Sequence, residues 1–331
     1  MPLPSQATID GDAYLIAFAK WLRAHERRLG QATAANLLPG RRVVSQSWLA
    51  PTAKDVKPLT LQIDPHHLCY LLLRFEEAGL AANHTGPLDL PLDAPLTRPL
   101  SFIGLLQNGG DLSAISSRKD TSDTSSIMSA VSTTFSFGSS WFSSNQPSKS
   151  KDVLLADARF AYACFTKLPS LSLSPSLPPP PLNAFVRGFE SIPDGVYVPL
   201  YTFKNLQFLT LDSLDPLAIL GWDFLADSLK TLEIRKSGIE DVSQLFVDAV
   251  VDDARRREGK RVDNRLRDGE EEAKRLPPTK WRSLRRLVLA QNDITFISSC
   301  PWNHFDALVH LDLSSNLLVS IPAGKLTLVM L

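Results

Sequence analysis

The chain has 331 residues, and its 35 basic and 35 acidic side chains cancel. This balance excludes a global electrostatic field that recruits nucleic acid or an anionic membrane. Three scattered cysteines, Cys69, Cys164 and Cys300, exclude a disulfide framework and favour a reducing compartment. The apolar stretch 14–22 is too short for a membrane span and contains Lys20, so we expect a cytoplasmic protein without a secretory signal.

Composition divides the chain into three blocks. Residues 1–100 form a helical N-terminal region, and residues 101–152 form a Ser-rich low-complexity linker. Residues 153–331 carry the repeats described below, with a charged insertion at about 247–278.

Two helices are expected in the first block. Asp10 or Asp12 can cap the first, and Asp64 caps the second, with Pro65 at its first position and Gly79 after its last turn. Apolar residues of the second helix share one face: Leu68, Leu71, Leu72 and Phe75. The block predicts a small helical cap or a separate small domain.

The same helix carries the residues closest to a metal-binding pattern: His66, His67, Cys69 and His84. His66 and Cys69 share a helix face, but no second paired motif supplies the remaining ligands. We therefore interpret them as ordinary helix residues and a buried thiol, and we expect no metal and no cofactor. No Gly-rich phosphate loop or nucleophile elbow occurs, so we also expect no enzymatic activity.

The Ser-rich block is too polar to bury a core, which favours a disordered linker that can be phosphorylated. Residues 124–148 nevertheless carry no charge, and wound as a helix they gather bulky side chains on one side. This composition is also typical of helices that bind packing defects in curved membranes, and a docking peptide is a third interpretation. The residues for membrane contact are Ile127, Met128, Val131, Phe135, Trp141 and Phe142.

Two segments near the end, 284–294 (LRRLVLAQNDI) and 308–318 (LVHLDLSSNLL), match the leucine-rich repeat pattern L-x-x-L-x-L-x-x-N-x-L at every position. Their spacing of 24 residues is typical of such repeats. The pattern predicts a short parallel strand with buried leucines. It also predicts an asparagine, Asn292 or Asn316, whose amide hydrogen-bonds backbone groups at the bend.

Weaker copies begin at residues 229 and 206, where Ser237 and Leu214 replace the asparagine. The wide gap before residue 284 predicts one repeat with an insertion of roughly 31 residues, since repeat proteins tolerate insertions in loops. The stretch 168–173 (LPSLSL) resembles a strand, but we do not count it as a full repeat. The prediction is an α/β leucine-rich repeat solenoid of about four to five irregular repeats with short parallel strands.

The insertion mixes opposite charges, so it predicts a solvated helix or disorder. Its Arg255, Arg256 and Arg257 are also compatible with a nuclear-import or phosphate-binding patch, although neighbouring acidic residues weaken that interpretation.

Side chains that alternate with the buried leucines line the concave side of the predicted coil. This mixture of aromatic, polar and charged residues suits a polar partner surface. The predicted partner-binding residues are Phe208, Thr210, Asp212, Thr231, Glu233, Arg235, Arg286, Val288, Ala290, His310, Asp312 and Ser314.

The order of these segments, from 64–80 (DPHHLCYLLLRFEEAGL) through 281–294 to 311–322 (LDLSSNLLVSIP), resembles a group of fungal leucine-rich repeat proteins. That group in turn resembles the animal serine/threonine kinase 11-interacting protein family. The resemblance implies a cytoplasmic scaffold whose protein partners include a kinase, with peripheral placement on endosomal or vacuolar membranes.

We therefore expect an intracellular scaffold or adaptor that binds a protein on its concave face. The alternatives are a subunit resembling the phosphatase-1-binding leucine-rich repeat family, whose repeats are more regular, and a peripheral membrane adaptor acting through 124–146. Residues 325–331 (KLTLVML) offer no polar outer face, so we also expect self-association through an uncapped C-terminal end.

Overall fold

The computed structural model describes residues 8–32, 57–80, 148–175, 182–190, 198–258, 276–297 and 301–319. The helices in these ranges are α1 (Gly11–Gly30), α3 (Pro65–Glu77), α7 (Ser148–Lys167), α8 (Trp222–Ser228) and α9 (Val250–Arg257). Shorter helical turns are η2 (Pro216–Ala218), η3 (Gln244–Ala249) and η4 (Pro301–His304).

The main sheet is formed by β2 (Leu61–Ile63), β3 (Ser170–Leu173), β6 (Phe208–Asp212), β8 (Thr231–Arg235), β9 (Arg286–Val288) and β10 (His310–Asp312). Two-residue strands form two smaller sheets, in which β1 (Thr8–Ile9) pairs with β4 (Phe185–Val186) and β5 (Val198–Pro199) with β7 (Ile219–Leu220).

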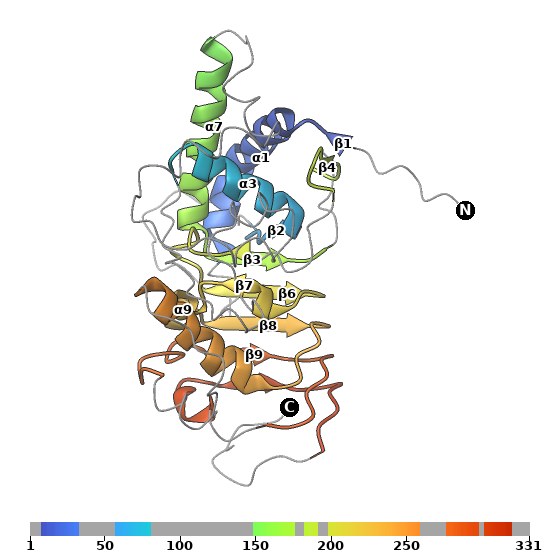
Figure 1. Ribbon diagram of the computed structural model, residues 1–331, viewed down its shortest axis with the longest axis vertical. Coiled ribbons are helices and arrows are strands. Elements are labelled where there is room, and N and C mark those ends of the chain that lie inside the picture. The colour runs from blue at the N-terminus through green and yellow to red at the C-terminus, as the bar shows by residue number, and fades with distance from the viewer. Residues whose placement is uncertain are drawn as a thin grey trace, which may run out of the picture.

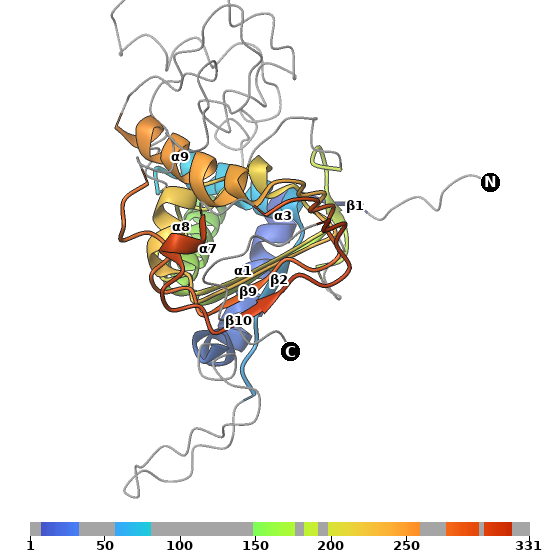
Figure 2. The same ribbon diagram turned by 90° about the horizontal axis from the view of Figure 1, so that it is seen from below.

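The main sheet is parallel throughout, and its strands follow one another in chain order from β2 to β10. Figure 1 shows them stacked along the long axis of the molecule, with α9 beside them. In Figure 2, α7, α8 and α9 lie on one side of this sheet. The result is a mixed fold of helices and parallel strands, in which each successive strand of the main sheet pairs beside the one before it.

The register of the sheet follows the leucine pattern. One fully buried row joins equivalent positions of successive strands: Leu171, Leu209, Leu232 and Leu287. The stretch at 168–173, which the sequence predicts to be strand-like but not a full repeat, supplies β3 in this same register, so its strand is confirmed. Strand β8 pairs directly with β9 although their repeats begin 55 residues apart, as expected for one repeat that carries an insertion.

The first block contributes to the same sheet, because β2 pairs with β3. Helices α1 and α3 both pack against α7 above this end of the sheet (Figure 1). Their shared core is aromatic: the rings of Phe18 and Phe75 meet Phe165 edge-on at centroid distances of 5.9 and 5.4 Å. The described residues of the first and third blocks therefore share a sheet and a core.

The sequence correctly predicted where the first two helices begin. The Asp10 carboxylate accepts a hydrogen bond from the Asp12 N–H at 3.0 Å, and the Asp64 carboxylate accepts one from the His66 N–H at 2.7 Å. Pro65 occupies the start of α3, and Gly79 follows its end with a φ of +68°. These caps satisfy backbone groups that helix ends leave unpaired.

A left-handed bend recurs after four strands of the main sheet: β6, β8, β9 and β10. It falls seven residues after the first leucine of each repeat, at residues with φ between +51° and +60°: Ser213, Lys236, Gln291 and Ser315. Residues other than glycine rarely adopt this backbone conformation. Its recurrence shows that the two degenerate copies have the same backbone shape as the two strict ones.

Several predictions fall on residues that the structure does not describe. They are the membrane-contact residues between 127 and 142, the C-terminal segment 320–331, and the individual residues His84 and Cys300. Within the described ranges, no helix has the length and apolar character needed to cross a membrane.

Candidate protein-binding face

The side of the main sheet opposite the buried leucines is the candidate functional site. Alternation along each strand turns every second side chain outward. We call the partly exposed side chains on this side the strand face: Thr210, Asp212, Thr231, Glu233, Arg235, Arg286, His310 and Asp312.

Three residues predicted to contact a partner are buried instead. Phe208 is 3 % exposed, Val288 0 % and Ala290 2 %. Val288 lies in register between Glu233 and Asp312 on the two neighbouring strands. These apolar side chains stabilise the sheet by burial, and the prediction that they form part of the contact surface was wrong.

The charged residues of the strand face pair with one another across the strands. Glu233 on β8 lies 3.2 Å from the Nε of Arg286 on β9 and 3.8 Å from a terminal nitrogen of Arg235. The three side chains are 24 %, 37 % and 36 % exposed, respectively. Pairs this exposed are screened by water and contribute little to stability, so they remain accessible to a partner.

Asp312 on β10 is held in its ionised form. Its carboxylate accepts hydrogen bonds from Ser314, whose N–H lies 3.0 Å away, and these bonds lower the pKa of Asp312. The positive charge of Arg235 lowers it further. The strand face therefore presents a fixed negative charge beside the Glu233–Arg286 pair.

The two motif asparagines connect successive repeats. Asn292 donates to the Ile234 carbonyl at 2.9 Å and accepts from the Ser237 N–H at 2.9 Å. Asn316 likewise donates to the Leu289 carbonyl at 2.7 Å and accepts from the Ile294 N–H at 3.3 Å. Each amide satisfies a donor and an acceptor in the preceding repeat, which fixes the spacing of the strands that carry the strand face.

Unlike the ion pairs of the strand face, one ion pair on the helix side of the sheet is buried. Asp253 in α9 accepts hydrogen bonds from the N–H groups of Gly221 and Trp222, at 2.8 and 2.9 Å, at the start of α8. Arg256 pairs with Asp253 at 2.7 Å, and the two side chains are 1 % and 0 % exposed. The sequence predicted a solvated helix or disorder here, because neighbouring opposite charges usually face water. The described part of the insertion, up to residue 258, is instead anchored in the interior.

A second set of charges surrounds Asp223 in α8. Its buried carboxylate lies 3.1 Å from Arg257, and Lys280 donates to the Asp223 carbonyl at 2.6 Å and to the Asp227 carboxylate at 2.8 Å. Burial raises the pKa of Asp223, and the nearby charge of Asp253 adds to this effect. The insertion helix and the segment after it are thus fastened to the same helix, α8.

The histidines and cysteine considered for metal binding have structural contacts. His66 Nδ1 lies 2.9 Å from the Phe189 carbonyl, and His67 Nε2 lies 3.0 Å from the Ala184 carbonyl. Burial raises the pKa of the Cys69 thiol well above its usual value, which keeps it protonated. The described residues contain no group of three or more His, Cys, Asp or Glu side chains arranged to hold a metal ion.

Comparison with known proteins supports the repeat assignment. Over 253 residues the chain is 33 % identical to a leucine-rich repeat-containing protein of Schizosaccharomyces pombe, itself described as uncharacterized. The alignment covers 75 % of this chain but 38 % of the relative, so the chain spans less than half of that protein's length. No family model matches the chain. The similarity supports a fungal leucine-rich repeat protein.

Proposed function

We propose that this chain is a leucine-rich repeat solenoid that binds a protein partner through the strand face. The observation that carries the proposal is the charged network on β8, β9 and β10, in which Glu233, Arg286 and Asp312 stand on adjacent strands. Paired leucines and bridging asparagines hold these strands in register, so the charges form a preorganised pattern. Preorganisation favours binding because little freedom is lost on association.

The partner chemistry follows from the mixture of charges. Asp212, Glu233 and Asp312 are acidic, whereas Arg235 and Arg286 are basic. A complementary surface must therefore present both signs in a fixed arrangement, which a folded protein surface does and a uniformly charged polymer does not. The proposed partner is a polar protein surface with at least one acidic and one basic side chain.

On this proposal the chain acts as a scaffold or adaptor in the cytoplasm and works by binding rather than by catalysis. The name of the similar fungal protein identifies a leucine-rich repeat and no partner. The proposal also includes a kinase or a phosphatase as the partner and placement on endosomal or vacuolar membranes. These two parts are based on the family resemblance alone.

The test compares partner recovery by the full chain and by a charge-swapped variant carrying Glu233→Arg and Arg286→Glu. This swap keeps an ion pair at the site but inverts its direction, so we expect an unchanged circular dichroism spectrum and at least a ten-fold loss of recovered partner. Mass spectrometry of affinity-purified material measures the recovery.

The matched control changes Arg282 to Glu and Glu26 to Arg, both exposed and outside the strand face. This control should recover the partner as well as the original chain does. Full recovery by the Glu233→Arg, Arg286→Glu variant would place the interface on another surface and overturn the proposal.

A further inference from the structure

A small pocket opens along the edge of the sheet at which the strands end, separate from the strand face. Its volume is about 100 Å³, and it lies between the turn after β6 and the turn after β8. Pockets that enclose a drug-sized ligand measure roughly 300–1,000 Å³. This pocket, which we call the edge pocket, therefore has the size for one side chain.

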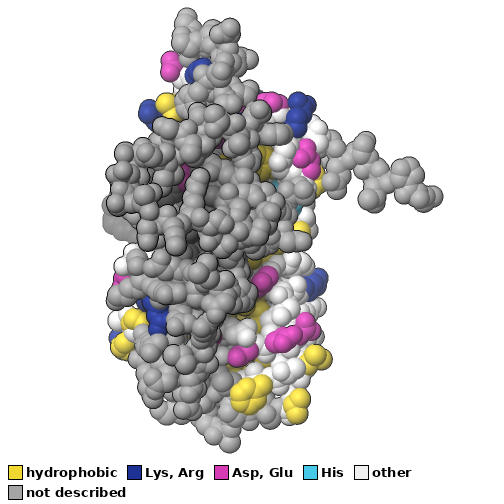
Figure 3. Space-filling model, viewed as in Figure 1, with side chains coloured by type: hydrophobic (Ala, Val, Ile, Leu, Met, Phe, Trp, Pro, Cys, Tyr) yellow, Lys and Arg dark blue, Asp and Glu magenta, His cyan; other side chains and the backbone are white. Residues whose placement is uncertain are grey.

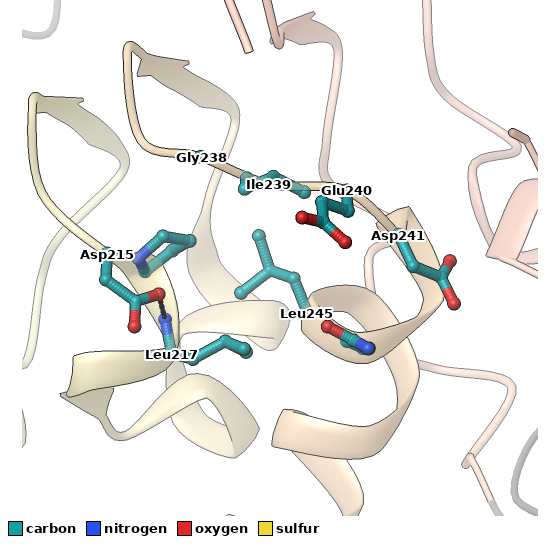
Figure 4. A pocket seen from close by; sticks show the side chains of 9 residues that line it. Asp215, Leu217, Gly238, Ile239, Glu240, Asp241 and Leu245 are labelled. Carbon is teal, nitrogen blue, oxygen red and sulfur yellow. Dashed lines mark hydrogen bonds between the residues drawn. The ribbon is translucent and has the colours of Figure 1, made fainter. Parts of the chain in front are cut away.

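The wall of the edge pocket is apolar and its rim is acidic. Pro216, Leu217, Ile239 and Leu245 supply the apolar wall, and the exposed Asp215 and Glu240 stand at the rim. Figure 4 shows the Leu245 side chain between Asp215 and Glu240, whereas the Asp241 carboxylate points away.

Hydrogen bonds hold two carboxylates at this pocket in place: Asp215 at the rim and Asp241, which points away from it. One oxygen of Asp215 accepts the Leu217 N–H at 2.8 Å, which fixes this carboxylate at the rim. Asp241 is bound twice by Ser243, at 2.8 and 2.7 Å, so its negative charge stays in place although its oxygens are occupied.

Negative charge continues along this edge beyond the pocket. Asp293 lies beside Gly238, since a Cβ built on that glycine would be 4.0 Å from its carboxylate. Lys236 is the exposed basic residue of the same turn. Figure 3 shows acidic and hydrophobic side chains together along this edge, at the right of the view.

The exposed aromatic side chain of Phe296 lies in the next repeat, beside the segment that carries Asp241. The backbone of Phe296 bridges that of Asp241, and the Phe296 side chain is 57 % exposed. An aromatic residue in water beside an acidic rim offers an anchor for an apolar group next to a cation.

We propose that the edge pocket binds the side chain of an arginine or lysine in a basic segment of a partner protein, and that an apolar neighbour in that segment packs on Phe296. Such a side chain combines an aliphatic stem with a charged head. The stem matches the apolar wall and the head matches the acidic rim. A hydrated metal ion lacks the stem, and an acidic or purely apolar segment lacks the head.

The test measures fluorescence anisotropy of nine-residue labelled peptides with the full chain. The first peptide carries a central arginine flanked by leucines. The comparison peptide carries citrulline in place of this arginine, because citrulline is uncharged but has nearly the same shape. We expect the arginine peptide to bind at least ten-fold more tightly, and less tightly as salt concentration rises. Equal affinities, or no binding by the arginine peptide, would overturn the proposal.

Variants locate the site. Asp215→Asn with Glu240→Gln should weaken binding of the arginine peptide at least ten-fold, because asparagine still accepts the Leu217 N–H while the charge is lost. Phe296→Ser should remove the advantage of flanking leucines over flanking serines. The matched control, Glu26→Gln with Asp306→Asn, removes two exposed carboxylates elsewhere and should change nothing.

The edge pocket is independent of the strand face, so the two proposals fail separately. The strand-face variant Glu233→Arg, Arg286→Glu should bind the arginine peptide normally. Peptide binding that is lost in this variant but kept in the Asp215→Asn, Glu240→Gln variant would reject the edge pocket and move the basic segment to the strand face.

Discussion

The two sides of the sheet use the same kind of ion pair for opposite purposes. Glu233 and Arg286 on the strand face are 24 % and 37 % exposed, whereas Asp253 and Arg256 on the helix side are 0 % and 1 % exposed. Water screens the first pair, so keeping its charges on the surface has a small free-energy cost, and a partner can contact them. The second pair is removed from water, so its partners must be present for the fold to form.

The largest expected effect is on the buried side. Asp253→Ala removes the carboxylate that pairs with Arg256 in the interior and that accepts the Gly221 and Trp222 N–H groups. Removing one member of a buried pair costs about 3–5 kcal/mol. Urea unfolding should show a loss of this size. Arg282→Ala, which removes an exposed arginine side chain, should cost much less. Equal costs would remove the distinction between buried and exposed charge.

The next effect concerns the asparagines that hold the strands in register. Asn292→Ala removes a donor and an acceptor from backbone groups of the preceding repeat. Leaving buried groups unpaired costs about 1–3 kcal/mol each. Ser315→Ala, at an exposed position, should change stability by less than about 0.5 kcal/mol. Small and similar losses at both positions would show that the repeat register does not depend on the amide.

A double-mutant cycle on Glu233 and Arg286 should give a small coupling energy. Exposed pairs typically couple by about 0.2–1 kcal/mol, and the coupling should fall as salt concentration rises. Chemical unfolding of the two single alanine variants and the double variant measures it. A coupling near that expected for a buried pair would mean that the strand face is structural, not free for binding.

The smallest effect is on the pH dependence of stability. Burial raises the folded-state pKa of Asp223 above 3.8, so protonation favours the folded state. This contribution is fully present below pH 3.8 and is lost as pH rises through the folded pKa. Asp223→Asn should therefore gain stability relative to the original chain as pH rises from 4 to 7. A constant difference across this range would mean that Asp223 titrates as it does in the unfolded chain.

The leucine pattern predicted the parallel strands and the asparagine contacts because both are set by spacing within one repeat. It identified 168–173 as strand-like, but the proline run after Leu173 breaks the pattern, so it could not show that this strand joins the sheet in the same register. It also missed the left-handed bends, since the residues there include Lys236 and Gln291 rather than glycine. Local sequence carries no signal for such positions when tertiary contacts impose the backbone shape.

The burial of Asp253 could not be predicted from its neighbours, because its hydrogen-bond donors lie more than 30 residues earlier in the chain. Similarly, alternation along the strand predicted an accessible Val288 and could not reveal that this side chain is fully buried. The edge pocket had no sequence signal at all, since it is formed by two turns that become neighbours only when the strands stack.

Carboxyl footprinting tests the central claim, that the strand face is the binding surface, most directly. The full chain is labelled with a carbodiimide and an amine, alone and with its recovered partner, and modified residues are located by mass spectrometry. The account predicts that the partner reduces labelling of Glu233 and Asp312, while labelling of the exposed Glu26 and Asp306 stays the same. Unchanged labelling of Glu233 and Asp312 in a saturated complex would contradict it.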